Sequence, residues 1–248
     1  VLDESSFHLL IATTPKQIYN LLISRAVDGI ILLGLEMDDP YIDDLERSDI
    51  PVIVLGAFKP ESRFSYYSPD YAGAVRQSVE YLHSLGHQKI GFICGPPNTY
   101  KWRSNQMAFG EITAKFNILE AGSLVTQDYS QESGYQSFSN LLKSGASLPT
   151  AYVTTSDNLA VGVIKAAQDH GFSIPGDLSI VSYGDIPIAK MVQPALTTAA
   201  APFTKMASDA ARALIEMVET HHFEPKRLLY PVSLSIREST GPVDPKRR

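Results

Sequence analysis

Two carboxylates follow apolar runs that have the character of buried strands. Asp157 comes shortly after the run at 151–154, and Asp185 follows the run at 178–182. The segment 194–198 supplies a third polar loop. The carboxyl ends of parallel strands meet at one edge of a sheet, and open α/β folds bind ligands at that edge. The sequence therefore predicts a small-molecule site formed by these loops.

The chemistry of such a site suits a hydroxyl-rich ligand. Sugars present hydroxyl groups in pairs together with apolar ring faces, so a sugar site needs carboxylates or amides beside a flat aromatic ring. Asp157 could accept hydrogen bonds from ligand hydroxyls, but it could equally cap the helix that follows it. Both interpretations are open at this point.

Catalytic and metal-binding patterns are absent from the sequence. It has no nucleophile elbow with partner His and Asp residues, and no glycine-rich phosphate loop. His221 and His222 are adjacent, so on a helix they point in different directions. The acidic run at 38–46 suits a solvated first helical turn, and Cys94 lies in an apolar run typical of a buried strand thiol. We therefore expect a protein that is not an enzyme and holds neither a metal ion nor a cofactor.

Composition and charge also exclude several classes of partner. The 248 residues are 44% hydrophobic and 19% charged, which is ordinary for a globular protein. A formal net charge of -6 argues against a nucleic-acid surface, because phosphate binding needs clustered Lys and Arg. No apolar run approaches the roughly 18 residues of a membrane span, and the N-terminus lacks a secretion-signal pattern. We expect a cytoplasmic protein that enters no membrane and does not bind DNA through this region.

Short apolar runs alternate with amphipathic stretches, as they do in parallel α/β sheets. Strands are predicted at 8–12, 29–33, 52–55, 90–94, 151–154 and 178–182, and helices at 18–24, 72–85, 105–116, 134–143, 159–170 and 203–219. A lobe of this kind normally opens with a strand and a full helix, whereas residues 1–6 resemble only the end of a helix. We therefore expect the first strand of the N-terminal lobe to be missing from this sequence.

Several motifs, in their order and spacing, resemble one known family. They lie at 27–32, 50–55, 85–93, 95–96, 149–151, 156–157, 194–198 and 236–240. Together they resemble the effector-binding region of LacI/GalR transcription factors over nearly the whole chain. The resemblance implies an α/β fold with two doubly wound parallel-sheet lobes of periplasmic-binding-protein type I, joined by three crossover segments.

The resemblance also implies limits for the two lobes. The N-terminal lobe should comprise 1–94 plus 201–222, and the C-terminal lobe 95–200 plus 223–241, followed by a tail at 242–248. The crossovers are then expected near 94–95, 198–201 and 222–226. In this arrangement a ligand lies between the lobes, and three hinge segments permit closure around it.

Family resemblance assigns effector contacts to the predicted polar edge. Ser156, beside Asp157, matches a position of polar contact, and Tyr129 matches a position where an aromatic ring stacks on a sugar. Packing of a loop tyrosine and helix capping by Asp157 are the alternatives.

Two positions depart from the family pattern. Asn105 stands where the family usually has an arginine that clamps the ligand, and Arg103 lies two residues earlier. Either Arg103 replaces the clamp or Asn105 contacts the ligand with a neutral amide. Gly184 stands where an acidic contact is common, so Asp185 is the expected substitute, unless the glycine makes room for a larger ligand.

The resemblance implies the ligand-sensing and dimerisation core of a bacterial transcriptional regulator. Its partners are then a small effector, expected to be a carbohydrate, a second copy in a homodimer, and operator DNA bound through a helix-turn-helix domain absent from this sequence. A periplasmic sugar-binding protein of a transport system is the alternative, which would carry a secretion signal and behave as a monomer.

Overall fold

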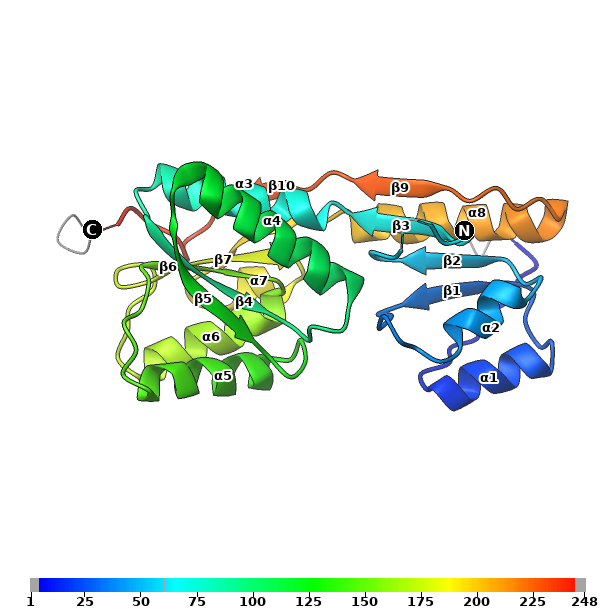
Figure 1. The fold of residues 1–248 in the computed structure, drawn as a ribbon, viewed down its shortest axis with the longest axis horizontal. Coiled ribbons are helices and arrows are strands. Elements are labelled where there is room, and N and C mark those ends of the chain that lie inside the picture. The colour runs from blue at the N-terminus through cyan, green and yellow to red at the C-terminus, as the bar shows by residue number, and fades with distance from the viewer. Residues whose placement is uncertain (1–4, 60, 244–248) are drawn as a thin grey trace. The chain divides into compact units, whose positions relative to one another are not determined.

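The computed structural model describes residues 5–59 and 61–243, which form two compact units (Figure 1). Unit 1 comprises Val1–Pro69, Asn98–Lys101 and Pro202–Tyr230, and unit 2 comprises Asp70–Pro97, Trp102–Ala201 and Pro231–Arg248. Each unit is therefore assembled from segments that are distant in the sequence. Most of the expected tail at 242–248 lies outside the described residues.

Unit 1 is built on a parallel sheet in the order β1-β2-β3-β9. Its strands are β1 (Ile30–Leu33), β2 (Val52–Leu55), β3 (Ser65–Pro69) and β9 (Arg227–Tyr230), and its helices are α1 (Pro15–Ile23), α2 (Ile42–Arg47) and α8 (Phe203–Thr220). Val52 and Val54 pack with the buried side chains of α2, whereas Ile53 packs with those of α8. Strand β2 is apolar throughout because helices cover both of its faces.

Unit 2 contains a six-stranded sheet in the order β10-β8-β7-β6-β4-β5. Its strands are β4 (Lys89–Cys94), β5 (Leu119–Val125), β6 (Ala151–Thr154), β7 (Ser179–Gly184), β8 (Thr197–Ala200) and β10 (Ser233–Ser235), of which only β10 runs antiparallel to its neighbour. Its helices are α3 (Tyr71–Ser84), α4 (Tyr100–Phe116, whose first two residues belong to unit 1), α5 (Gln131–Lys143), α6 (Asp157–Asp169) and α7 (Ile188–Met191). One face packs against α3 and α4, and the other against α5 and α6.

Helices α5 and α6 approach each other at two glycines. A Cβ atom built on Gly162 would lie 2.0 Å from the carbonyl oxygen of Gln131, and one on Gly134 would lie 2.4 Å from the carbonyl oxygen of Leu159. Backbone atoms cannot move aside as a flexible side chain can, so both positions require glycine. This contact fixes α6, whose first turn carries Asp157.

The structure differs from the predicted elements in three respects. The strand predicted at 8–12 is wrong, since this segment has no regular structure. Strands β3, β5, β8, β9 and β10 were not predicted, because their sequences are polar, small or exposed rather than continuously apolar. The units divide before Asp70, so 70–94 lies in unit 2, whereas the expected N-terminal lobe extended to residue 94. Strand β9 pairs with β3, so 223–230 lies in unit 1, whereas the expected C-terminal lobe included it.

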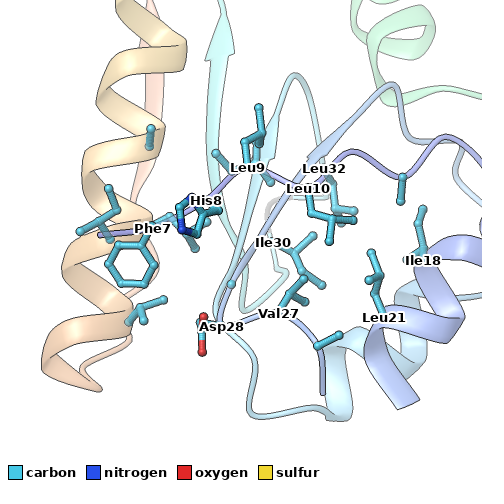
Figure 2. A pocket seen from close by; sticks show the side chains of 18 of the residues that line it. Phe7, His8, Leu9, Leu10, Ile18, Leu21, Val27, Asp28, Ile30 and Leu32 are labelled. Atoms are coloured by element: carbon cyan, nitrogen blue, oxygen red, sulfur yellow. The ribbon is translucent and has the colours of Figure 1, made fainter. Parts of the chain in front are cut away.

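A largely apolar cavity of about 580 Å³ lies in unit 1 between residues 6–12, α1, β1 and α8 (Figure 2). Strand β1 is the edge of the sheet on this side, and among the described residues no backbone–backbone hydrogen bond reaches residues 8–12. Leu9 and Ile11 are accordingly 70% and 73% exposed. Few polar side chains line this cavity, so it does not match the chemistry expected for a sugar. The missing first strand stays a prediction.

We expect Gly162→Ala to destabilise unit 2 by more than about 2 kcal/mol, because the new methyl group overlaps backbone atoms of α5. Chemical denaturation followed by circular dichroism measures the change. Lys165→Ala is the matched control on the same helix; it removes an exposed ion pair with Asp169 and should cost less than about 1 kcal/mol. Equal stability of the Gly162→Ala variant and the parent protein would contradict the close helix contact.

Candidate functional site

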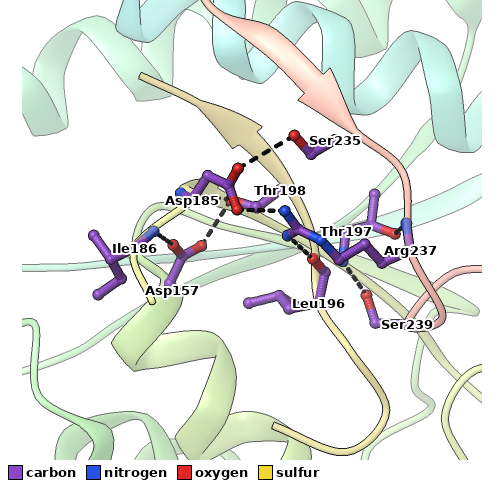
Figure 3. A network of polar contacts seen from close by, with 9 residues as sticks. All are labelled: Asp157, Asp185, Ile186, Leu196, Thr197, Thr198, Ser235, Arg237 and Ser239. Atoms are coloured by element: carbon purple, nitrogen blue, oxygen red, sulfur yellow. Dashed lines mark hydrogen bonds and ion pairs between the residues drawn. The ribbon is translucent and has the colours of Figure 1, made fainter. Parts of the chain in front are cut away.

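The carboxyl ends of β6 and β7 carry a connected set of polar side chains in unit 2 (Figure 3). Asp157 begins α6 directly after β6, and Asp185 follows β7. Thr198 of β8 lies beside both, because its hydroxyl bonds to the Asp157 carboxylate and accepts a hydrogen bond from the Asp185 backbone N–H at 3.4 Å. The predicted polar edge of the sheet is therefore a bonded network.

Asp157 is the buried centre of this network. Its side chain is only 1% exposed. Oδ1 accepts a hydrogen bond from Thr198 Oγ1 at 2.7 Å, and Oδ2 accepts one from the Ile186 backbone N–H at 2.9 Å. Its position in the first turn of α6 also places the negative charge at the positive end of the helix dipole. Asp157 thus connects α6, the loop after β7 and strand β8.

Asp157 does not act as the simple cap of α6 that the sequence allowed as an alternative. The capping position of α6 is Ser156, whose extended backbone begins the helix without a side-chain cap hydrogen bond. The Asp157 carboxylate bonds to other segments instead. Each carboxylate oxygen has two lone pairs, so a further hydrogen bond to each oxygen remains chemically possible.

Asp185 is held by an ion pair with Arg237. The Arg237 Nη2 atom lies 2.5 Å from Asp185 Oδ1, and the two side chains are 16% and 18% exposed. Ser235 donates to the other carboxylate oxygen at 3.3 Å, and Arg237 also donates to the Leu196 carbonyl oxygen at 2.7 Å. The charge of Asp185 is therefore matched within the protein.

Gly184 and Asp185 both have left-handed backbone angles, with φ values of +137° and +58°. A Cβ atom at Gly184 would lie 2.9 Å from Asp157 Oδ2. Glycine at this position thus relieves backbone strain and leaves the Asp157 carboxylate uncrowded. An acidic side chain here would place a second negative charge against Asp157.

The two candidates for the ligand clamp, Arg103 and Asn105, lie on opposite sides of helix α4. Asn105 is 3% exposed and lines a cavity of only about 10 Å³ with Thr155, Ser182 and Tyr183 at the carboxyl ends of β6 and β7. Arg103 is exposed. Two residues along a helix correspond to about 200° of rotation, so these side chains leave opposite sides of α4. The structure brings Asn105, and not Arg103, to the polar edge.

Aromatic side chains complete this edge of the sheet. The half-buried Tyr129 packs its ring over Gly95, where a Cβ atom would lie 2.3 Å from the ring. The rings of Tyr71 and Tyr183 are 5.3 Å apart, and burial raises the pKa of both phenols. The sequence did not predict the contact between the rings of Tyr71 and Tyr183. The two rings meet only because α3 packs on β7, although Tyr183 directly precedes the predicted polar loop.

Within the described ranges, no cluster of three or more His, Cys, Asp or Glu side chains could hold a metal ion. Over the same ranges, no helix is both long and apolar enough to cross a membrane.

Known proteins place the chain in one family. Residues 79–240 match the periplasmic binding protein-like domain. Over 240 residues the chain is 31% identical to an uncharacterized HTH-type transcriptional regulator in the aml 5' region of Streptomyces limosus, covering 92% of this chain and 67% of that protein. It therefore spans about two thirds of that relative.

Solved structures agree with this assignment. A putative LacI transcriptional regulator from Bacillus cereus subsp. cytotoxis has a TM-score of 0.85 at 28% identity, covering 92% of this chain and 81% of that one. A LacI family transcriptional regulator from Enterococcus faecium with bound ribose has a TM-score of 0.82 at 27% identity, covering 94% of this chain and 86% of that one. The expected family is confirmed: this chain belongs to the LacI family of transcriptional regulators and forms its periplasmic-binding-protein-like region.

Proposed function

We propose that this chain is the ligand-sensing and dimerisation core of a cytoplasmic LacI-type regulator and binds a small sugar at the carboxyl edge of the unit 2 sheet. The network centred on Asp157 is the observation that carries this proposal. The bound sugar alters operator binding by a helix-turn-helix region outside this chain. A role in transport is the weaker candidate, because relatives that are similar in sequence and in fold are named as regulators. No catalytic role is proposed.

Individual residues have different parts in the proposed site. Ser156 and Asn105 supply uncharged hydrogen-bonding groups for sugar hydroxyls, and Tyr129 supplies a flat ring for an apolar sugar face. Asp157 holds the loops in place and offers its remaining lone pairs. Asp185 acts through its ion pair with Arg237 and does not contact the sugar.

The network also connects the proposed ligand site to two of the segments that join the units. Thr198 lies in β8, and the chain passes from unit 2 into unit 1 shortly after this strand, at 201–202. Strand β10 follows the return crossing at 230–231 and carries Ser235, a partner of Asp185. A ligand that shifts the Asp157 loops thus acts on two connections between the units. Regulation requires only that the ligand bind one arrangement better than the other.

The first test is a thermal-shift screen of neutral sugars. A specific sugar at a hundredfold excess over its Kd should stabilise the fold by about 2.7 kcal/mol, which corresponds to a shift of about 5–10 °C. The same sugar should change operator affinity of the intact regulator by about 5–150-fold in a mobility-shift assay. A sugar that shifts the melting temperature but leaves operator affinity unchanged would support the transport candidate instead.

Tyr129→Ala should weaken sugar binding at least about fivefold, because a stacked ring contributes on the order of 1 kcal/mol beyond its buried area. Isothermal calorimetry well below the melting temperature measures the affinity. Tyr135→Ala is the matched control, since Tyr135 is also half-buried in unit 2 but bonds to Asp169 on α6. Equal losses in the two variants would remove the support for stacking.

Asp185→Asn should lower stability by about 3 kcal/mol and leave sugar affinity within threefold of the parent value. The reason is that the substitution leaves Arg237 mostly buried without its counter-charge. Urea denaturation and calorimetry measure the two quantities. The double variant Asp185→Asn, Arg237→Gln should lose less than the sum of the single losses. A large loss of affinity with unchanged stability would instead make Asp185 a direct ligand contact.

A further inference from the structure

Residues 98–101, here called the anchor segment, belong to unit 1, although the chain on both sides of them belongs to unit 2. At 69–70, 201–202 and 230–231 the chain passes from one unit to the other and remains there. At 97–98 it leaves unit 2, and it returns at 101–102. The sequence predicted three crossovers, and this short excursion was not among them.

Polar contacts hold the anchor segment on the loop that follows β1. The Met37 backbone N–H donates to the Asn98 carbonyl oxygen at 3.0 Å. The Asn98 side-chain amide donates to the Asp38 carboxylate. The loop is itself fixed, because the Glu36 N–H donates to Asp39 Oδ2 at 2.8 Å. Asn98 is therefore bonded to unit 1 through both its backbone and its side chain.

An aromatic contact adds an apolar attachment. The ring of Tyr100 lies 5.3 Å from that of Phe58, at an interplanar angle of 62°. Aromatic pairs favour such an edge-to-face arrangement. Phe58 is buried in a cluster that includes Leu45 and Val54, and Tyr100 packs against the same cluster. The anchor segment thus has both directed and apolar contacts with unit 1.

Helix α4 is fixed in unit 2 only two residues after Tyr100. Trp102 packs against the apolar cluster that contains Phe92 and Phe109, whose rings stack at 4.5 Å. The same helix carries five buried residues further along, namely Asn105, Ala108, Phe109, Ile112 and Thr113. One helix is therefore attached at its first residue to unit 1 and along most of its length to unit 2. The short attachment to unit 1 is the weaker of the two.

The chain on either side of the anchor segment is stiff. Between Tyr100 and Asn105, α4 contains neither proline nor glycine, at which helices commonly bend. Before Asn98, the rings of Pro96 and Pro97 fix the φ angle of each residue. A change in the arrangement of the units is therefore not absorbed by bending at this point. It must break the contacts between the anchor segment and unit 1.

We propose that the anchor segment is a releasable latch, which couples α4 and its polar-edge residue Asn105 to unit 1 while docked and detaches when the units change their arrangement. The inference rests on the proposed function and deepens it, since it names a contact through which a ligand at the polar edge acts on unit 1. Regulation then requires only that the ligand favour the docked or the detached state.

Hydrogen exchange followed by NMR measures the docking without any ligand. The Met37 amide hydrogen is bonded to the anchor segment, so it exchanges when that segment detaches. Asp38→Ala removes the acceptor of the Asn98 amide and should accelerate this exchange about fivefold, as for the loss of one hydrogen bond. Tyr100→Ala should accelerate it to a similar degree, and the double variant about twentyfold.

Matched variants separate detachment from a general loss of charge or stability. Asp38→Asn keeps an acceptor oxygen and should stay within about twofold of the parent rate. Asp49→Ala removes an exposed acid of unit 1 outside this loop and should also stay within about twofold. The Gly56 amide, which donates to the Tyr67 carbonyl oxygen at 3.0 Å, should keep its parent rate in every variant. Equal acceleration at Gly56 would mean that unit 1 loosens as a whole and would overturn the latch.

The regulatory consequence is measured on the intact regulator. Asp38→Ala should change its operator affinity by at least about fivefold in a mobility-shift assay, because the coupling between the units is altered. Asp49→Ala should change it by less than about twofold.

The latch and the proposed function fail differently. Parent-like exchange of the Met37 amide in both Asp38→Ala and Tyr100→Ala would overturn the latch, and so would an unchanged operator affinity despite faster exchange. Failure of every sugar in the thermal-shift screen would count against sugar sensing, whereas the docking of the anchor segment is measured independently of any sugar.

Discussion

The buried carboxylate of Asp157 is the interaction on which the polar edge of unit 2 depends. A carboxyl group that is 1% exposed needs hydrogen-bond partners, and this one obtains them from Thr198 and Ile186. Three segments that are distant in the sequence are thereby held together. The left-handed Gly184 is part of the same constraint, because a side chain there would crowd the carboxylate.

Close packing on the far side supports this network. Helix α6 is positioned by glycine contacts with α5, and backbone atoms cannot yield at such a contact. The N-terminal end of α6 therefore presents the capping residue Ser156 and Asp157 from a rigid element. The loops after β5 and β7 carry Tyr129 and Asp185. Rigid positioning of small polar groups favours recognition of hydroxyls, which require directed hydrogen bonds.

The sequence predicts the continuously apolar strands well and the others poorly. Strand β6 is recognisable because both of its faces are buried, whereas β3 and β9 depend on pairing that only the folded sheet provides. In the site, the position of Asp157 shortly after a predicted strand correctly indicated that this residue lies at the polar edge. It could not show that Arg237, 52 residues after Asp185, would neutralise that acid. Long-range ion pairs leave no local pattern.

The comparison of Asp157 with Asp185 shows why residue type alone does not identify a ligand contact. Both are acids after parallel strands, but one has an arginine partner and the other has only neutral hydrogen-bond donors. A carboxylate without a counter-charge keeps its electric field, whereas the matched pair presents little net field to its surroundings. The selectivity of such an edge therefore depends on which acids the fold has neutralised, and less on how many acids it contains.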